Sequence, residues 1–522
     1  MASPLKAFGL SLLLPFISSA QTPLAPTYEA LTNAAATGGD FRFSGAGTII
    51  VPTPVSFAAA TTLDADGHAV ILSGGGKASI LQLETNVTLT LRGVGLIDGL
   101  ARGSEEAGAL KAGEGGAIVN LGGDLTLKNC VLSNNIASGA TNKIGLVAGP
   151  FGDLVMGPLP VARPAADAAG GAIWQIGGRL VIENCAFSMN RVSSSFLSGA
   201  PGEGGAIYIR NAEGLDILGT RFLSNSVVSG GTSFSYPELS SPAKGGAIYV
   251  EATPARIDGG EISGNGSAGG SGISLGGAIY QGGSSLTVSN VVVWQNGSFG
   301  GFTPGRFMQR GFDAAGGAIF SDGELMVDSS AFLSNVCAAG EAANGAGPTF
   351  AYGGAISSGG SIRIVNTTLS GNESYSTYRD SFGVRIHVTE GGALYCGGTA
   401  GITNSTIVGH LKSLSPLGAG STNTITVKNT LLADNRYEPQ RNPVVDAGHN
   451  LSSDAEPLFT QSTSANGANP KLGPLGLYGG STPSYSLAAG SPAIDAADDS
   501  AAPAKDQRGR TRPFGAHADW RV

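Results

Sequence analysis

The chain has 522 residues, of which 83 are glycine and only 13% are charged. This composition suits a long β-structure with many turns and argues against a helical bundle or a disordered chain. The formal net charge of −8 argues against a nucleic-acid partner and gives no sign of a basic membrane-binding surface.

Residues 1–20 have the pattern of a secretory signal peptide. Lys6 precedes an apolar run from Ala7 to Ile17, and Ser18-Ser19-Ala20 supplies the small residues of a cleavage site. A transmembrane anchor is the competing interpretation, but the run is shorter than the roughly 18 apolar residues that a spanning helix needs. We therefore expect a bacterial protein that is secreted or attached to the cell surface, with no transmembrane segment in the mature chain.

Residues 21–99 contain strand-like segments without a repeated motif. Because the end of a stacked fold has to be covered, we expect an N-terminal cap followed by the first irregular rungs. The strand-like segments are 41–43, 48–51, 69–72, 79–83 and 87–91.

Residues 100–440 carry two motifs that recur together. Gly-Gly-Ala-Ile/Leu occurs eight times, and an apolar-x-x-Asn tetrad starts 16 to 18 residues after each one. Repeats of this length predict stacked units rather than one globular fold. The doublets begin at Gly115, Gly170, Gly204, Gly245, Gly276, Gly316, Gly353 and Gly391. The tetrads end at Asn135, Asn190, Asn225, Asn265, Asn296, Asn335, Asn372 and His410, and a ninth half-repeat ends at Asn435.

Each repeat also contains a short strand and two predicted turns. Leu215-Asp-Ile217 is typical of the strand, and its period of two points both aliphatic side chains into a core. The residue six before the closing Asn is mostly Asn or Gly, which tolerate the positive φ of a tight turn. The closing Asn column is expected to form a ladder of stacked amides that saturates backbone groups at the second turn.

These features predict an all-β protein: a single-stranded, right-handed parallel β-helix with capped ends and long loop insertions on one side. A kelch-type propeller is the alternative, but it needs a regular repeat of about 50 residues. The doublets here are 31 to 55 residues apart, and the variation follows the Asn. We expect the insertions to form one loop-covered face; they are 136–169, 191–203, 226–244, 297–315, 336–352 and 373–390.

Four cysteines are too few for a disulfide framework in an exported chain of this length. Cys130 and Cys185 occupy the same position in successive repeats, which places them within Cα range of a bridge but in an awkward parallel geometry. A disulfide and two buried free thiols both remain open, and we favour the thiols. Cys337 and Cys396 have no evident partner.

The paired Gly-Gly-Ala-Ile and Phe-x-x-Asn motifs resemble the repeats of polymorphic outer-membrane proteins and of the wider pectin lyase-like β-helix proteins exported by bacteria. Within 441–522, the segments Gly479-Gly480-Ser-Thr-Pro483, Gly490-Ser-Pro-Ala-Ile-Asp495 and 506–513 are similar to the choice-of-anchor Q domain. That domain commonly precedes a cell-surface sorting signal. The resemblance implies a β-helix, export and a C-terminal cap region, whereas function follows poorly from fold. No sorting tail or autotransporter barrel is seen, which favours release.

The sequence has no strong catalytic signature. It contains no Gly-x-Ser-x-Gly elbow, His-Glu-x-x-His motif, phosphate loop or calcium nonapeptide repeat. We therefore predict no catalytic residue, no metal ligand and no cofactor; calcium has no motif to support it. Asp495, Asp498 and Asp499 form an acidic cluster, for which ion pairs in a capping turn are favoured over a cation site.

The first candidate binding surface is the residue after the Ile or Leu of each Gly-Gly-Ala-Ile/Leu motif. Because the Ile faces the core, this neighbour is expected to face outward, and rings stacked one rung apart form an apolar strip that suits sugar rings. The alternatives are that the column packs under the insertion loops or that it faces the core. Six of the eight residues are aromatic: Trp174, Tyr208, Tyr249, Tyr280, Phe320 and Tyr395.

The second candidate surface consists of two insertion loops that are two rungs apart, or about 10 Å at parallel-strand spacing. They combine arginines with aromatic residues, a combination that suits an acidic polysaccharide. The alternative is a pair of solvated loops whose aromatic residues fix them to the stack. The candidate residues are Arg306, Arg310, Tyr375, Tyr378, Arg379, Arg385 and His387, with Phe299, Phe302 and Phe307 beside them.

We therefore favour an exported, non-catalytic protein, expected to be a monomer, that binds a polysaccharide, a cell-surface glycan or another surface. A carbohydrate-active enzyme, either a polysaccharide lyase or a glycoside hydrolase, is the alternative. A hydrolase needs two carboxylates about 5–10 Å apart, which the repeat strands do not offer. A structural spacer with no ligand is the third hypothesis.

Overall fold

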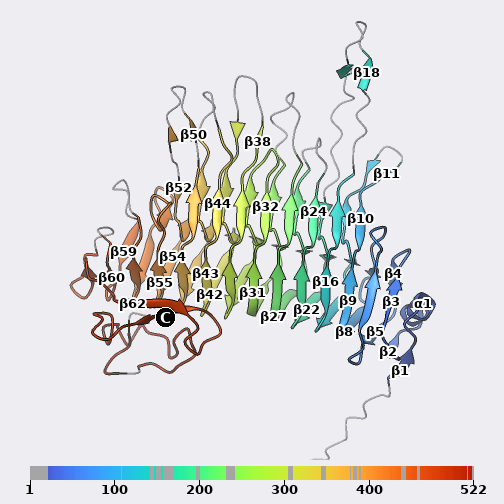
Figure 1. The fold of residues 1–522 in the computed structure, drawn as a ribbon, viewed down its shortest axis with the longest axis horizontal. Coiled ribbons are helices and arrows are strands. Elements are labelled where there is room, and N and C mark those ends of the chain that lie inside the picture. Colours follow the sequence, from blue (N-terminus) through green and yellow to red (C-terminus); the bar gives the residue numbers. More distant parts are fainter. Residues whose placement is uncertain are drawn as a thin grey trace, which may run out of the picture.

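In the computed structural model the chain is a parallel β-helix whose coils stack along one long axis (Figure 1). The predicted fold class is confirmed. The structure describes residues 21–106, 109–140, 146–148, 154–156, 168–194, 200–230, 241–303, 310–342, 348–376, 378–379, 385–386, 389–436, 443–454, 459–513 and 515–519.

One coil illustrates the others. Its strands pair in parallel with those of the next coil and in register, so that Ile207 meets Ile248 and Tyr208 meets Tyr249. In most coils the longest strand is divided in two by a turn. The strands of this coil are β25 (Gly202–Glu203), β26 (Ile207–Arg210), β27 (Gly214–Leu223) and β28 (Ser226–Val228).

Four long sheets result from this stacking. A 26-stranded sheet and an 11-stranded sheet enclose the core, and two 8-stranded sheets form a fin above it (Figure 1). The 11-stranded sheet extends from β4 (Val55–Phe57) to β56 (Leu417–Ala419). The first fin sheet extends from β10 (Leu100–Arg102) to β49 (Glu373–Tyr375), and the second fin sheet from β13 (Gly113–Glu114) to β52 (Thr389–Glu390).

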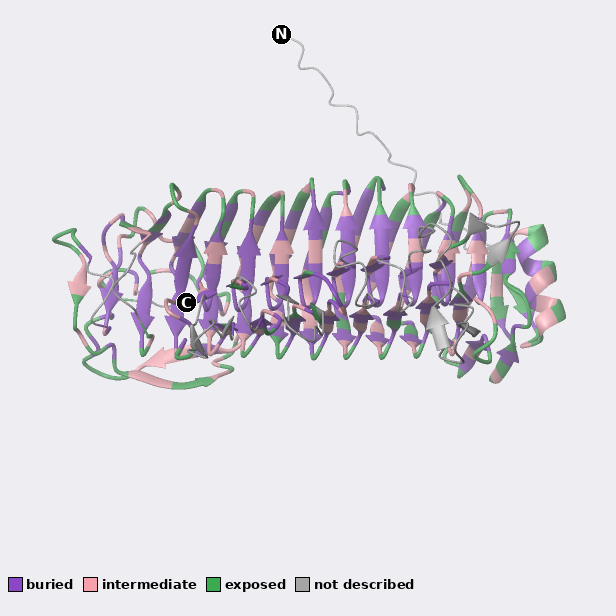
Figure 2. Cartoon of the chain, turned by 90° about the horizontal axis from the view of Figure 1, so that it is seen from above, coloured by how far each residue is buried: buried purple, intermediate pink, exposed green. Residues whose placement is uncertain are grey.

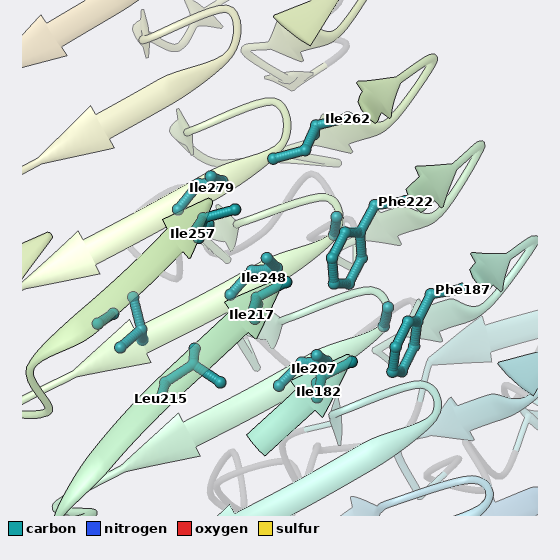
Figure 3. Packing of buried hydrophobic residues seen from close by; sticks show 14 of the residues in the cluster. Ile182, Phe187, Ile207, Leu215, Ile217, Phe222, Ile248, Ile257, Ile262 and Ile279 are labelled. Carbon is teal, nitrogen blue, oxygen red and sulfur yellow. The ribbon is translucent and has the colours of Figure 1, made fainter. Parts of the chain in front are cut away.

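The core is a column of aliphatic and phenylalanine side chains in identical positions of successive coils (Figure 3). The predicted strand pairs, such as Leu215 and Ile217, are buried there, together with the Ile of each Gly-Gly-Ala-Ile motif. Phe187 and Phe222 stack with their ring centroids 4.9 Å apart. Purple strand segments along the whole body in Figure 2 show that this core is continuous.

The Gly-Gly doublets form tight corners between the second fin sheet and the 11-stranded sheet. Gly204 has a φ of +66°, a conformation that favours glycine. A Cβ on Gly205 would lie 2.0 Å from the carbonyl oxygen of Gly246 in the next coil. The doublet is thus required for two separate reasons, the backbone conformation of its first residue and the close coil stacking at its second.

The predicted asparagine ladder is present, and its asparagines from Asn135 to Asn372 are buried. Asn190 Nδ2 donates to Asn225 Oδ1 at 2.9 Å and to the Leu132 carbonyl at 2.9 Å, and the Asn190 N–H donates to the same Asn225 Oδ1. His410 continues the ladder, and its Nδ1 lies 2.9 Å from Asn435 Oδ1. Asn435 Nδ2 then donates to Asp454 Oδ2 at 2.9 Å, so a carboxylate that only accepts hydrogen bonds ends the series.

The other predicted turn also has the expected geometry, because every residue six before the ladder position has a positive φ, Asn129 and Gly219 included. All four cysteines are buried free thiols. The Cys130 N–H donates to Cys185 Sγ at 3.3 Å, and the Cys185 N–H donates to Thr220 Oγ1 at 3.2 Å. The Cys185 thiol therefore accepts from the coil before it, in the column where Thr220 and Ser330 accept in the same way.

The fin was not expected, since the sequence predicted only loops after each Asn. Each insertion begins and ends in a fin strand instead, and the two fin sheets pack on small residues such as Ala137, Val192 and Ala243. Such small residues give a weak hydrophobic pattern, which explains the error. Among the residues that the structure describes, four antiparallel hairpins extend from the fin: β11 (Glu105–Glu106) with β12 (Ala109–Leu110), β18 (Leu146–Ala148) with β19 (Leu154–Met156), β38 (Phe302–Thr303) with β39 (Arg310–Gly311), and β50 (Tyr378–Arg379) with β51 (Arg385–Ile386).

Helix α1 (Tyr28–Thr37) covers the N-terminal end of the stack (Figure 2). Thr27 caps it, with Thr27 Oγ1 accepting from the Ala30 N–H, and Leu31, Ala34 and Ala35 are buried. The structure thus contains the cap that the sequence predicted. No helix in the described ranges is long and apolar enough to cross a bilayer.

The C-terminal segment folds back along the flank of the 26-stranded sheet. The hairpin of β62 (Leu472–Gly476) and β63 (Ser484–Leu487) lies beside the last coils (Figure 1). Gln507 Nε2 donates to the Ser330 carbonyl at 3.1 Å, and Gln507 Oε1 accepts from Thr368 Oγ1 at 2.9 Å. This segment therefore joins coils that are more than a hundred residues away in the sequence.

Candidate functional site

The predicted aromatic column is a stack of rings on the outer side of the 11-stranded sheet. Tyr208 and Tyr249 have ring centroids 4.8 Å apart and planes inclined by 8°, and Tyr249 and Tyr280 are 4.9 Å apart at 10°. Trp174 and Phe320 extend the stack at its two ends, at 6.3 and 5.5 Å from their neighbours. The rings form a cluster separate from the core, so the predicted outward direction is correct.

Ser357 interrupts the column between Phe320 and Tyr395. Tyr352, from the neighbouring strand of the second fin sheet, lies with its ring centroid 4.5 Å from that of Tyr395 and is inclined by 39°. A ring from the fin therefore occupies the space next to the serine.

Charged residues border the column on both sides. Lys244 lies 5.5 Å from the ring centroid of Tyr249 and 5.0 Å from that of Tyr280, and pairs with Glu203 at 3.0 Å. On the other side Tyr249 donates to Glu251 Oε2 at 2.9 Å, and Glu251 pairs with Arg210 at 2.9 Å. The sequence analysis did not select these four charged residues. Their places in the repeat could have indicated them. Two stand directly before a Gly-Gly doublet, and the other two stand two residues after an aromatic position of the column.

The environment of the column suppresses tyrosine ionisation. Burial, with the nearby Glu203 carboxylate as the second cause, raises the pKa of Tyr208 to about 12. Burial and the same carboxylate also raise the pKa of Tyr249. Both hydroxyls therefore keep their protons under ordinary conditions.

The column is largely covered, which agrees with the alternative that it packs under the inserted segments. Tyr208 is 7% exposed and Tyr249 only 3%. Neighbouring rings cover the faces that sugars would use, since the planes are nearly parallel and one strand spacing apart. The accessible groups are the ring edges at the two ends of the column and the polar residues beside it.

More accessible aromatic residues lie on the first fin sheet. Phe299 and Tyr375 are 42% and 37% exposed and occupy one column, separated by the buried Ala338. Phe302, in the adjoining hairpin, is 49% exposed. Gly297 leaves room for the Phe299 ring, since a Cβ there would lie 2.4 Å from its Cε2 atom.

The two predicted insertion loops do leave the fin two strands apart, because Gly297 pairs with Val336 and Val336 with Glu373. Arg306 and His387 lie outside the described residues. Of Arg310, Tyr378, Arg379 and Arg385 only the backbone is described, within the hairpins of β38 with β39 and of β50 with β51. The structure therefore brings Phe299 and Tyr375 together, while the predicted arginines of this face stay a prediction.

Two of the three aspartates in the acidic cluster of the C-terminal segment form ion pairs, and Asp495 accepts a hydrogen bond from the His517 N–H. Asp498 pairs with Lys428 at 2.8 Å and Asp499 with His517 at 2.9 Å. Hydrogen bonding to Asp499 raises the pKa of His517. Asp506 pairs with Arg508. Within the described ranges, no group of three or more His, Cys, Asp or Glu side chains is arranged to hold a metal ion.

Comparison with known proteins does not identify a family: no protein-family model matches the chain, and no curated protein matches it.

Proposed function

We propose that this protein is an exported, non-catalytic β-helix that binds an extended polysaccharide on its first fin sheet. The observation that supports this proposal is the pair of exposed rings, Phe299 and Tyr375, in one column of that sheet. Aromatic rings with a free face are the groups on which the C–H faces of sugars pack, and a tyrosine adds a hydroxyl for hydrogen bonding.

The spacing of the two rings supports an extended ligand. They are two parallel strands apart, which corresponds to about 10 Å. An extended polysaccharide covers a comparable distance with two sugar units, so two sugars separated by one other would meet the two rings. Ala338, between them, leaves the intervening sugar unobstructed. Next to Tyr375, Lys412 pairs with Glu373 at 2.6 Å and supplies polar groups at the edge of the surface.

A non-catalytic role agrees with the state of the carboxylates near the other aromatic surface. Glu203 is paired with Lys244, and Glu251 with Arg210. A glycoside hydrolase needs a carboxylic acid on one side of the bond that it cleaves and a carboxylate on the other side. Both carboxylates are thus bound to a cation, an arrangement that does not match the acid and base pair of a hydrolase at this position.

The export part of the proposal depends on the sequence. Residues 1–20 have the pattern of a signal peptide. The resemblance of the repeats to polymorphic outer-membrane proteins, and of the C-terminal segment to the choice-of-anchor Q domain, agrees with a role at or outside the cell surface. N-terminal sequencing of the protein recovered from the medium and from cell envelopes tests this part: a chain that begins near Gln21 is expected, and an uncleaved cytoplasmic chain would contradict it.

The binding part is tested with the mature protein and a panel of neutral and acidic polysaccharides, by pull-down on insoluble glycan and by affinity electrophoresis. Phe299→Ala and Tyr375→Ala should each weaken binding about tenfold, since each removes one stacking platform worth about 1.4 kcal/mol. Leu477→Ala, at an exposed apolar residue of the C-terminal segment, is the matched control. Unchanged affinity in both ring variants would contradict the proposed surface, and release of reducing ends or unsaturated products would contradict a non-catalytic role.

A further inference from the structure

A cavity lies where the fin begins, lined by residues of the last coil without fin strands and of the first coils with them. Its volume is about 670 Å³, within the range of about 300–1,000 Å³ that is usual for ligand sites. It forms because the coil that contains Gly75 and Gly76 turns back without entering the fin, whereas the next coil contributes β10, the first strand of the first fin sheet. A step between a short coil and a taller one is thus left open to solvent.

The side chains that line this cavity combine three kinds of group. Leu100 and Ile136, paired across adjacent strands, form an apolar floor. Asp98 accepts a hydrogen bond from Asn134 Nδ2 at 2.6 Å, which fixes a carboxylate and an amide at the rim. Arg102 lies opposite Ser138 on the next strand.

Arg102 is a cation that lines this cavity. It makes no ion pair with any side chain that the structure describes, and its side chain is exposed at the cavity. An arginine presents two parallel N–H donors that match a carboxylate. Asp98 and Asn134 are suited to sugar hydroxyls, and the apolar floor to the C–H face of a sugar ring.

The cavity is continuous with the surface assigned to polysaccharide binding. Arg102 begins the same column of the first fin sheet in which Phe299 and Tyr375 lie. The four residues between Arg102 and Phe299 are small: Ser138, Ser193, Val228 and Ala268. Five strand spacings, or about 24 Å, separate the cavity from the first ring.

A second cation lies beside this track. Arg191 is exposed, occupies the column that contains Leu100 and Ile136, and makes no ion pair within the described ranges. It lies two strands from Leu100, or about 10 Å. Arg102 and Arg191 therefore both lie near the cavity end of the track.

We infer that the cavity binds a terminal sugar that carries a carboxylate, with Arg102 on the carboxylate and Asp98 and Asn134 on the hydroxyls. The inference depends on the proposed function for the rest of the chain of sugars, which would continue along the fin toward Phe299. Arg191 would meet a second negative charge along the ligand. The bound polysaccharide is accordingly an acidic one, held at one end in a defined position.

Isothermal titration calorimetry of the mature protein with two matched trisaccharides tests this inference. One ends in glucuronate, and the other ends in glucose at the same position. The wild-type protein should bind the glucuronate-terminated compound at least about tenfold more tightly, the ratio expected for one charge-assisted hydrogen-bonded pair. Arg102→Gln should remove this preference. Arg363→Gln, at an exposed arginine of the 26-stranded sheet, is the matched control and should retain it.

Equal affinity for the two trisaccharides, no binding of either, or the same result for Arg102→Gln and Arg363→Gln would overturn the inference. A Phe299→Ala/Tyr375→Ala variant separates it from the proposed function. If long polysaccharides bind through the rings while neither trisaccharide is preferred, the cavity assignment fails alone. If the trisaccharide preference holds while the double variant keeps its full affinity for long polysaccharides, the fin-surface assignment fails and the cavity assignment stands. Circular dichroism and thermal unfolding of each variant confirm that the fold is retained.

Discussion

The aromatic column on the 11-stranded sheet and the aromatic pair on the first fin sheet have the same strand spacing but different surroundings. In the column, rings stack within 4.8–6.3 Å of each other, and the bend into the second fin sheet encloses them. On the fin, Ala338 separates Phe299 from Tyr375, and both rings remain exposed. One set of rings binds its own neighbours, and the other leaves its rings available to a ligand.

This difference shows that the outward direction of a side chain does not establish its accessibility. Alternation along a strand predicts correctly which side of a sheet a residue occupies. It does not reveal whether a second sheet folds over that side, as the second fin sheet does at the Gly-Gly corners. An accessible surface needs both an outward direction and the absence of a covering sheet, and of these two sets of rings the fin pair meets both conditions.

The largest effect is expected from a substitution in the Gly-Gly corner beside the aromatic column. Gly205→Ala would place a Cβ 2.0 Å from the Gly246 carbonyl oxygen, a backbone atom that cannot move without shifting a whole coil. We expect a loss of at least about 4 kcal/mol in the free energy of unfolding, or no folded protein. Gly266→Ala, on the fin, meets no atom closer than 3.8 Å and should change stability by about 0.5 kcal/mol or less. Urea unfolding of both variants measures the difference; equal losses would show that the two surfaces are packed alike.

A smaller effect is expected from removing a ring. Tyr249→Ala deletes a buried ring that stacks on two others and should reduce the free energy of unfolding by about 3 kcal/mol. Phe299→Ala deletes an exposed ring of similar size and should change it by about 0.5 kcal/mol or less. Thermal and urea unfolding of the pair provide the measurement. A large loss in Phe299→Ala would mean that the fin ring has a packing role, and the case for a ligand there would weaken.

The repeated elements could be predicted from the sequence because each has a strong local cause. Gly204 requires a positive φ, and the column that contains Asn225 needs one amide at each coil, so both recur at constant positions. The strand pair Leu215 and Ile217 shows the period of two that marks a buried face. These three signals were enough for the coil, its core and its two turns.

The fin and the proposed ligand surfaces could not be predicted in the same way. Fin strands such as β28 have three residues and bury small side chains, and neither feature gives a readable pattern. Tyr352 occupies the space beside Ser357 from a different strand, a substitution that is visible only after the coils are stacked. The cavity near Arg102 results from the absence of fin strands in the preceding coil, which no motif marks.

The smallest effect is a pH dependence confined to the column. An unfolded tyrosine has a pKa near 10, whereas burial raises the pKa of Tyr208 to about 12. Between these values the unfolded chain has lost the proton and the folded chain retains it, so the free energy of unfolding falls as the pH rises from about 10 to 12. Tyr208→Phe removes this contribution. At pH 7 the free energy of unfolding of the variant should be within about 1 kcal/mol of the wild-type value. Between about pH 10 and 12 the wild type should lose up to about 2 kcal/mol more of its free energy of unfolding than the variant does. Unfolding curves across this range test the prediction, and parallel curves for the two proteins would mean that the Tyr208 hydroxyl is open to solvent. In that case the column would be as accessible as the fin, and it would become a second surface for the polysaccharide.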